Sequence, residues 1–422
     1  MKRFKEPLKT LLILLLTASA VFLAWKGSLF SAFFPEKAPV VSPSPEAQEH
    51  SYTAAALPYA AAVRGPGGLC CGVQYDEDTM ASLYESVSAI LSEALGSAEA
   101  PEPISRFTWQ DRLKEESLYL DYGFDLPISA LAAWVGVEAP WAGSRTGSAY
   151  LLDDNGSGSI RLSYRGGDGS FFQCPTAASW ATLRERLEEY RPNGALFAFE
   201  LPVLDDCEPY VLVLEQLPEL SLVSASAETG AAGAFAELFG INLGSQSRYT
   251  EADGALVYPG DSGVLRLSTD GSVSYSPAEG VLAAASPADQ IEEARKLLET
   301  VHGAYAGEER LRLRSVEAGE AGQLSLSFVY TLGGVRVDVA GGPAAAAVWK
   351  DGQLTELTLR PRSYRQGEAF TDLLPEKQAA AAAGSLCLGA AAELILPDMG
   401  EERIAPVWIV TLHGRKQWIQ ED

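Results

Sequence analysis

The spacing of hydrophobic residues along the chain predicts a mixture of helices and strands. In residues 76–96, apolar side chains recur every three or four positions, which is the spacing of one face of an α-helix. Shorter stretches of this period alternate with short runs rich in β-branched and aromatic residues, which is typical of strands. Helices are therefore expected at residues 76–96, 109–118, 128–135, 176–190, 231–239, 286–303 and from 374 onward.

Turn residues mark where the strands between these helices reverse direction. Asp-Gly pairs, which favour tight hairpins, stand at positions 253–254, 270–271 and 351–352. Strands are predicted at residues 118–122, 147–164 (as a hairpin), 196–201, 210–214, 255–258, 263–268, 272–275, 310–316, 324–331, 335–339, 345–349, 354–359, 406–412 and 416–419.

The second half of the chain shows the same order of elements twice, a helix followed by a meander of strands. The second of these helices has a strong start signal, because Ser286 suits the N-cap and Pro287 the first helical position. We interpret this as a weak internal repeat. The predicted fold class is α+β, with two or three modules of antiparallel sheet and helices packed on one face of each sheet.

Residues 10–25 form an uncharged, apolar segment behind four basic residues. A helix of this length spans about 24 Å, which is short against a hydrocarbon core of roughly 30 Å. Flanking lysines can extend to the membrane surface, and Trp25 suits the interface. We interpret the segment as a transmembrane helix that leaves the N-terminus in the cytoplasm and the rest outside the cell. The alternative is a cleaved signal peptide with its cleavage site at residues 18–20.

These features give a complete domain organisation, with the anchor followed by a stiff spacer that carries several prolines. The predicted parts are a cytoplasmic stub (1–9), a transmembrane helix (10–25), a Pro-rich linker (26–51), an N-terminal α+β domain (52–228), a middle helix-plus-sheet module (229–285) and a C-terminal helix-plus-sheet module (286–422).

Composition narrows the classes of partner. The net charge is −24, and residues 1–26 contribute five basic side chains against one acidic. The body beyond them is therefore strongly acidic, and it is repelled by nucleic acid and by anionic lipid headgroups. Nucleic-acid partners are excluded on this ground.

Five cysteines make an odd set with no metal-binding spacing. We expect most of them to be small buried side chains. A disulfide between Cys174 and Cys207 is the alternative that an extracellular compartment would permit.

Two short motifs resemble known functional sites, and both are better explained as turns. Residues 260–263, Gly-Asp-Ser-Gly, match the core of a chymotrypsin-type nucleophile site, but the histidines at 50, 302 and 413 lack the context of a catalytic triad. Residues 153–158 match the first half of a calcium loop, but position 12 is Tyr164 instead of Glu. We therefore predict no catalytic residue, no metal site and no cofactor.

Several short segments resemble the YycH/YycI-type regulatory proteins of Gram-positive bacteria, in a clostridial form. They follow a short stub, one membrane span and a Pro-rich spacer, and together they are spread over most of the chain. The segments are Leu-Tyr-Glu…Ser-Glu-Ala-Leu-Gly-Ser-Ala (83–98), Ile-Ser-Arg-Phe-Thr-Trp (104–109), Leu-Pro-Ile-Ser-Ala-Leu-Ala-Ala-Trp-Val-Gly (126–136), Arg-Tyr-Thr-Glu-Ala-Asp-Gly-Ala-Leu-Val-Tyr (248–258), Thr-Asp-Gly-Ser-Val-Ser-Tyr (269–275), Leu-Leu-Pro-Glu-Lys-Gln-Ala (373–379) and Pro-Val-Trp-Ile-Val-Thr (406–411).

The resemblance implies a non-enzymatic, membrane-anchored protein that associates with a WalK-type sensor histidine kinase of a two-component system and modulates it. A related single-span regulator is a further implied partner. The family's membrane helix is itself a contact, and small or polar residues allow helices to pack closely in a membrane. The candidates for this contact are Thr17, Ala18, Ser19, Ala20 and Ala24.

Two other classes of function stay open at this point. One is an exported ligand- or peptide-binding module of the PepSY kind, which would work without its anchor. The other is a cell-wall hydrolase, which would require a metal or Ser/His constellation that the sequence does not display.

Overall fold

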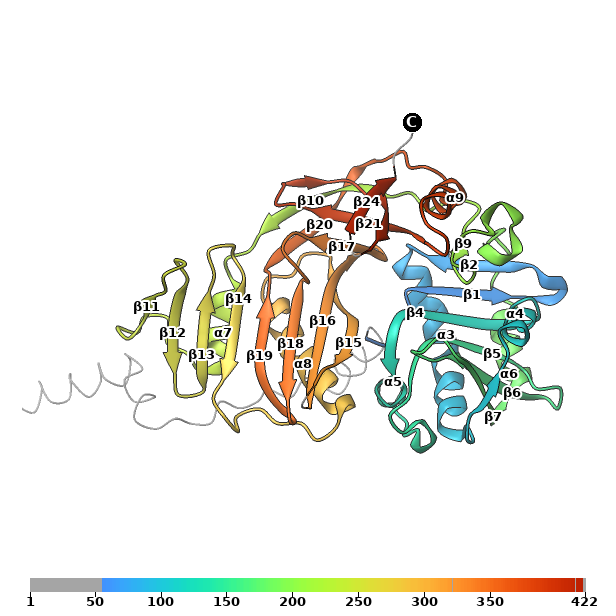
Figure 1. Cartoon of the computed structure of the whole chain (residues 1–422), viewed down its shortest axis with the longest axis horizontal. Coiled ribbons are helices and arrows are strands. Elements are labelled where there is room, and N and C mark those ends of the chain that lie inside the picture. Colours follow the sequence, from blue (N-terminus) through green and yellow to red (C-terminus); the bar gives the residue numbers. More distant parts are fainter. Residues whose placement is uncertain (1–54, 321, 414, 420–422) are drawn as a thin grey trace, which may run out of the picture. The chain divides into compact units, whose positions relative to one another are not determined.

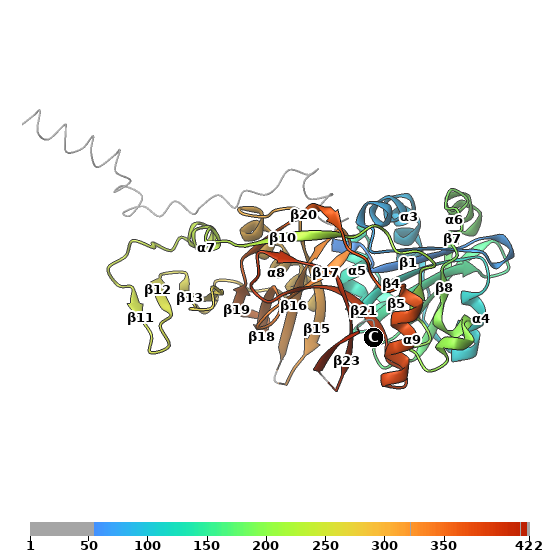
Figure 2. The same cartoon turned by 90° about the horizontal axis from the view of Figure 1, so that it is seen from above.

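The computed structural model describes residues 55–320, 322–413 and 415–419, and these form a mixed α+β fold (Figures 1 and 2). The predicted α+β class is therefore confirmed, in that antiparallel sheets are combined with helices. The predicted membrane helix and linker, residues 10–51, lie outside the described residues. No helix within the described part of the chain is long and apolar enough to span a membrane.

Seven α-helices lie in the described residues, and all seven were predicted from hydrophobic period, helix-start signals or composition. Two begin away from their predicted positions for local reasons. Helix α4 starts at Arg106 because the Ser105 hydroxyl accepts a hydrogen bond from the Thr108 amide at 3.0 Å. Helix α6 starts at Trp180 because residues 171–179 continue a strand. The helices are α3 (Glu77–Ser97), α4 (Arg106–Leu113), α5 (Ile128–Trp134), α6 (Trp180–Leu187), α7 (Ala231–Phe239), α8 (Pro287–Gly303) and α9 (Glu376–Leu386).

The first half of the described chain folds around a seven-stranded antiparallel sheet in the order β2-β1-β4-β5-β6-β7-β3. Helices α3, α5 and α6 pack in the main core on one face, and α4 packs with Tyr119 and Leu151 on the other. The expectation that helices cover one face only is therefore wrong for this sheet. Its strands are β1 (Ala60–Arg64), β2 (Cys70–Gln74), β3 (Glu102–Ile104), β4 (Ser117–Pro127), β5 (Thr146–Asp154), β6 (Ser159–Arg165) and β7 (Phe171–Ser179).

The outer edge of β2 is covered by the segment that follows α6. The Asn193 side chain accepts a hydrogen bond from the Gly72 amide at 2.9 Å and donates one to the Gly72 carbonyl at 2.7 Å. A small hairpin, β8 (Leu196–Phe197) with β9 (Leu212–Val213), packs beside this edge. Four 3-10 helices complete this half: η1 (Pro66–Gly68), η2 (Pro140–Ala142), η3 (Ala198–Glu200) and η4 (Pro202–Leu204).

The second half is built on a twelve-stranded sheet, with α7 and α8 packed on one face (Figure 1). Strand β14 pairs with β19, so strands from both predicted C-terminal modules lie in a single sheet. The predicted domain boundaries themselves stay a prediction. The pairing of β17 with β21 is parallel. The strands are β11 (Tyr249–Thr250), β12 (Leu256–Gly260), β13 (Gly263–Leu267), β14 (Val273–Pro277), β15 (Arg310–Ala318), β16 (Gln323–Leu332), β17 (Val335–Val339), β18 (Ala345–Lys350), β19 (Gln353–Leu359), β21 (Ala392–Asp398), β23 (Val407–Leu412) and β24 (Arg415–Ile419).

A third, three-stranded sheet joins segments that lie far apart in the sequence. Strand β10 (Ser221–Ala227) leads from the first half into α7, yet it pairs on either side with β20 (Arg362–Phe370) and β22 (Arg403–Ile404). The connection between the halves is thus a central strand of a sheet whose other strands come from the end of the chain.

The five cysteines are all unpaired, so the alternative of a Cys174–Cys207 disulfide is wrong. Cys174 lies in the main core, where burial raises the pKa of its thiol to about 12. Cys207 belongs to another cluster and donates to the Ala380 carbonyl at 3.1 Å. Four of the five are buried, as expected of small core side chains, and Cys387 is exposed.

Candidate functional site

The residues predicted for a membrane-helix contact, Thr17, Ala18, Ser19, Ala20 and Ala24, lie outside the described residues, and that contact stays a prediction. Among the described residues, no group of three or more His, Cys, Asp or Glu side chains is arranged to hold a metal ion.

The Gly-Asp-Ser-Gly motif is the turn between β12 and β13, as predicted. The Ser262 hydroxyl donates to the Phe239 carbonyl at 2.5 Å, and the Ser262 carbonyl accepts from the Tyr275 hydroxyl at 2.7 Å. Gly263 has a φ of +151°, and a Cβ there would lie 2.3 Å from the Ser276 carbonyl oxygen. The motif thus serves the packing of α7 against the sheet.

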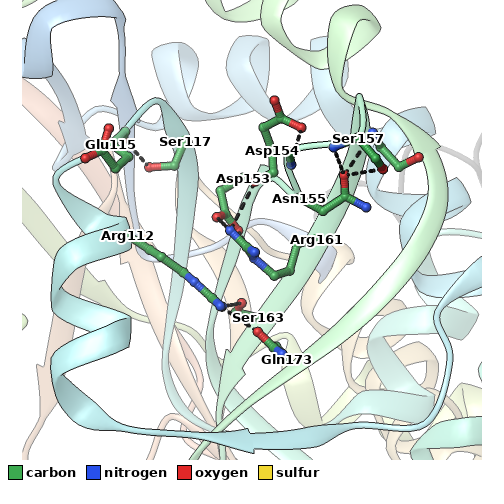
Figure 3. A network of polar contacts seen from close by, with 12 residues as sticks. Arg112, Glu115, Ser117, Asp153, Asp154, Asn155, Ser157, Arg161, Ser163 and Gln173 are labelled. Carbon is green, nitrogen blue, oxygen red and sulfur yellow. Dashed lines mark hydrogen bonds and ion pairs between the residues drawn. The ribbon is translucent and has the colours of Figure 1, made fainter.

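The calcium-like segment is the tip of the β5–β6 hairpin, also as predicted (Figure 3). The Asp154 and Asn155 side chains accept hydrogen bonds from backbone amides of the turn, at 2.9 Å from Gly156 and 2.8 Å from Ser157. Asp153 is buried and paired with Arg161. These oxygens are occupied by the hairpin's own donors, so the geometry gives the segment a structural role.

Of the described histidines, His302 is buried at the end of α8, where its Nε2 lies 2.9 Å from the Glu309 carboxylate. Glu309 also accepts the Tyr364 amide at 2.8 Å and the Gly307 amide at 3.1 Å. Although burial alone would raise it, the hydrogen bonds from His302 and these amides lower the pKa of Glu309. The pair joins α8 to β20 through the loop between α8 and β15.

The most elaborate polar arrangement lies where the seven-stranded sheet meets the twelve-stranded sheet, a region that we call the junction. Three arginines at alternate positions of β15 reach across it. Arg310 pairs with Glu77 at 2.6 Å, and Arg314 donates to the Gly123 carbonyl at 3.1 Å. Between them, the buried Arg312 donates to the Leu57 carbonyl and lies 4.2 Å from the centre of the Tyr59 ring. The three arginines connect β15 to three separate segments of the first half.

A buried carboxyl forms the second part of the junction. Glu376, the first residue of α9, is 3% exposed and accepts three hydrogen bonds. Gln74 Nε2 donates at 2.7 Å and the Tyr75 hydroxyl at 3.2 Å to one oxygen, and the Leu214 amide donates at 2.7 Å to the other. Burial raises the pKa of Glu376 to about 7, despite these donors. One side chain thus fastens α9 to the end of β2 and to the residue after β9.

Tyr75 itself is held in an uncommon conformation. Its φ is +59°, in the left-handed region that non-glycine residues rarely adopt. Its ring packs edge-on against Trp408 of β23, with 6.1 Å between ring centres. On the backbone side, Gly334 of the β16–β17 turn comes so close that a Cβ there would lie 2.9 Å from the Asp76 nitrogen. Contacts with β23 and with the β16–β17 turn therefore fix the end of β2.

A cleft of about 940 Å³ opens beside Tyr75. Its walls are the end of the seven-stranded sheet, strands β15 to β17, and two loops rich in Gly and Ala, residues 340–344 and 389–392. Its charged side chains are balanced within the cleft. Arg336 and Arg314 lie 2.5 and 3.5 Å from the Glu393 carboxylate, and Lys416 pairs with Asp338.

A smaller cavity of about 420 Å³ lies on the other side of the β16–β17 turn and also includes Tyr75. Its charged lining is mostly acidic, with Arg310 as the basic residue and Asp76, Glu77, Asp78, Glu219 and Glu308 as the acidic residues. The lining of this cavity is therefore acidic and that of the cleft is balanced, although only the β16–β17 turn separates the two.

Reasoning from the sequence did not find the junction or the cleft. Glu376 stood inside one of the segments that carry the family resemblance, residues 373–379, and at a helix start that was predicted from Pro375. The alternation of Arg310, Arg312 and Arg314 was also visible, but a charged row on a strand is ordinarily a solvated face. Neither signal indicates which distant residues pair with the Glu376 carboxylate or with the three arginines.

A solved structure resembles this protein in fold, whereas its sequence matches no family model and no curated protein. The mixed α+β fold, by contrast, is similar to that of a solved protein. The solved protein is YycH from Bacillus subtilis, whose crystal structure aligns with a TM-score of 0.53 at 12% sequence identity. The alignment covers 88% of this chain and 97% of YycH. At this identity, the likeness establishes a YycH-like fold.

A second solved structure, an uncharacterized protein from Eubacterium rectale, aligns with a TM-score of 0.30 at 13% identity over 48% of this chain and 81% of that one.

Proposed function

We propose that this protein is a non-enzymatic regulator, anchored in the cell membrane by residues 10–25, that associates with and modulates a sensor histidine kinase of a two-component system. The observation that carries the proposal is the YycH-like fold, which extends over 88% of the chain. The sequence segments that resemble the YycH/YycI type, which are spread over most of the chain, support it as well.

The local chemistry of the described residues agrees with a role in binding. Ser262 and the carboxyl groups of the β5–β6 hairpin are engaged in structural hydrogen bonds, so these motifs give no support to a hydrolase. The cleft, by contrast, offers a surface suited to another protein or a ligand.

Affinity co-purification of the full-length protein from detergent-solubilised native membranes tests the proposal. The matched control replaces residues 11–25 by an unrelated membrane span. Recovery of a histidine kinase with the native span and its loss with the replacement would support regulation through the membrane helix. Recovery with both spans would place the contact outside the membrane. A protein recovered soluble, cleaved and without kinase would overturn the proposal.

The cleft favours one alternative, an exported ligand- or peptide-binding module, because its volume of about 940 Å³ is that of a ligand-binding site. Such a module would function without its anchor, whereas the proposed regulator would not. A strain that secretes residues 27–422 without the span discriminates between them, since restored function would favour the binding module.

A further inference from the structure

We propose that the cleft beside Tyr75 binds an uncharged, extended peptide segment of a partner protein. The source that we assign to this segment is the extracellular part of the sensor kinase, and this assignment rests on the proposed function. The proposal goes beyond an association through the membrane helix, because it places a second contact in the folded body of the protein.

The dimensions of the cleft suit a peptide several residues long. Ligand-binding sites in proteins typically enclose about 300 to 1,000 Å³, and the cleft is near the upper end of this range. Its lining includes Ser327 and Val329 of β16 and Val337 of β17, all of which have short side chains.

The charges of the cleft argue against a charged ligand. Arg314 and Arg336 both contact Glu393, Lys416 is paired with Asp338, and Asp121 accepts hydrogen bonds from the Tyr119 hydroxyl at 3.0 Å and the Gly123 amide at 2.7 Å. A ligand carboxylate would have to displace Glu393 or Asp338 from its basic partner, and a ligand ammonium would have to compete with those basic partners or with the donors already on Asp121, which is costly in a partly buried site. An uncharged ligand leaves every pair intact.

The remaining lining presents backbone rather than large side chains. Gly341, Gly342 and Pro343 are exposed on one side, and Gly389 and Ala390 are at least partly exposed on another. Small residues allow the main chain of a ligand to approach the main chain of the protein, which is how extended peptides are commonly recognised.

A saccharide is the competing class of ligand, and the aromatic residues of the cleft disfavour it. Sugars are usually bound against a free aromatic face. The Tyr59 ring is already contacted by Arg312 and Arg314, at 4.2 and 5.8 Å, and Tyr75 packs on Trp408 with its hydroxyl on Glu376. Both tyrosines of the cleft are thus engaged within the protein.

Two substitutions on one strand test the site. Ser327 and Ser325 lie two positions apart on β16 and therefore on the same face, but only Ser327 lines the cleft. Ser327→Arg places a long side chain in the cleft, while Ser325→Arg adds the same side chain outside it. Equal thermal stability of the two variants shows that both fold.

The probe is a library of random 12-residue peptides displayed on phage, selected on the full-length protein in detergent. An enriched peptide is then synthesised with a fluorophore for anisotropy measurements. We expect enriched sequences without charge that bind wild type and Ser325→Arg alike, and Ser327→Arg at least ten-fold more weakly. Failure to enrich any peptide, unchanged affinity for Ser327→Arg, or saturable binding of chitotetraose that only Ser327→Arg abolishes would each overturn the proposal.

A second step identifies the source of the peptide and separates this proposal from the proposed function. Synthetic peptides that tile the extracellular part of the co-purified kinase compete with the labelled peptide. Competition by one tile supports the kinase as the source, and competition by none overturns that assignment. The co-purification and the peptide binding are separate measurements, so absence of a kinase from the co-purification while peptides still bind the cleft contradicts the proposed function and leaves the peptide site standing.

Discussion

At the scale of single residues, the junction depends on positions where a small change in chemistry acts on several elements together. Glu376 receives donors from the end of β2 and from the residue after β9, and it stands at the start of α9. Gly334 lets the β16–β17 turn approach the backbone of Tyr75 and Asp76. Each position can be tested alone.

The buried carboxyl of Glu376 should make stability depend on pH. Its pKa is about 7 in the folded protein and 4.5 ordinarily, so the folded state binds the proton more tightly than the unfolded chain. Its contribution to the free energy of unfolding is therefore full below about pH 4.5 and falls as the pH rises through 7, by about 3 kcal/mol. In Glu376→Gln this fall should be absent, as measured by urea denaturation at pH 5 and pH 8.

The control for this prediction is Glu317→Gln, which removes the same charge from an exposed position of β15. It should keep the pH dependence of the wild type. An equal dependence in Glu376→Gln and wild type would show that another group is responsible.

Gly334→Ala should destabilise the protein because it adds a Cβ where there is no room. The new atom would lie 2.9 to 3.2 Å from backbone atoms of Tyr75 and Asp76, and the φ of +86° is unfavourable for alanine. We expect a loss of about 2 to 4 kcal/mol in the free energy of unfolding. Gly271→Ala is the matched control, since φ is +84° there with nothing within 4 Å. Equal losses in the two variants would contradict a role for the close approach.

At the scale of elements, β15 is the strand whose arginines contact the first half of the described chain. These arginines differ in how much each contributes to the free energy of unfolding. Arg312 is 8% exposed, whereas the Arg310 side chain is 49% exposed. Arg312→Met should therefore cost about 2 to 3 kcal/mol, because the Leu57 carbonyl loses its donor in a buried place. Arg310→Met should cost less, about 1 to 2 kcal/mol, because Arg310 is largely solvated although the side chain of its partner Glu77 is only 10% exposed. Chemical denaturation checks both, and a larger loss in the Arg310 variant would contradict the assignment.

The elements that could be predicted from the sequence are those whose pattern is local. Helix α8 was marked by its cap, where the Ser286 hydroxyl accepts the Asp289 amide at 3.2 Å and Asp289 accepts the Ser286 amide at 3.1 Å. Strands β1 and β10 were missed for opposite reasons. Strand β1 is mostly alanine and buried on both faces, so it lacks alternation, and β10 is rich in serine with partners far along the chain.

At the scale of the whole molecule, the two halves of the described chain share the main core, and two smaller clusters lie beside it. The main hydrophobic cluster contains side chains from α3 of the first half together with α8 and β16 of the second. Helices α5 and α8 also touch, with Trp134 donating to Glu292 at 3.1 Å. The sequence could not predict that the main core extends through both halves. The hydrophobic period identifies which face of a helix is buried, but it does not identify the element against which that face packs.

A shared core predicts that the two halves unfold together. Native-state hydrogen exchange should give similar free energies of opening for the amides of β5 in the seven-stranded sheet and of β16 in the twelve-stranded sheet. Calorimetry should show a single transition for the part of the chain that the structure describes. Two separate transitions, or values for β5 and β16 that differ by more than about 2 kcal/mol, would show that the junction couples the halves weakly.

The position of β10 has a consequence for how the chain is made. If the protein is exported N-terminus first, residues 221–227 emerge well before their neighbours, since Ser224 pairs with residues 365 and 403. During that interval both edges of β10 lack their strand partners and can pair with other chains. Folding of an exported chain would therefore wait for nearly the entire polypeptide, and a shortage of extracytoplasmic chaperones would then reduce the yield of this protein before it affects proteins built from local contacts.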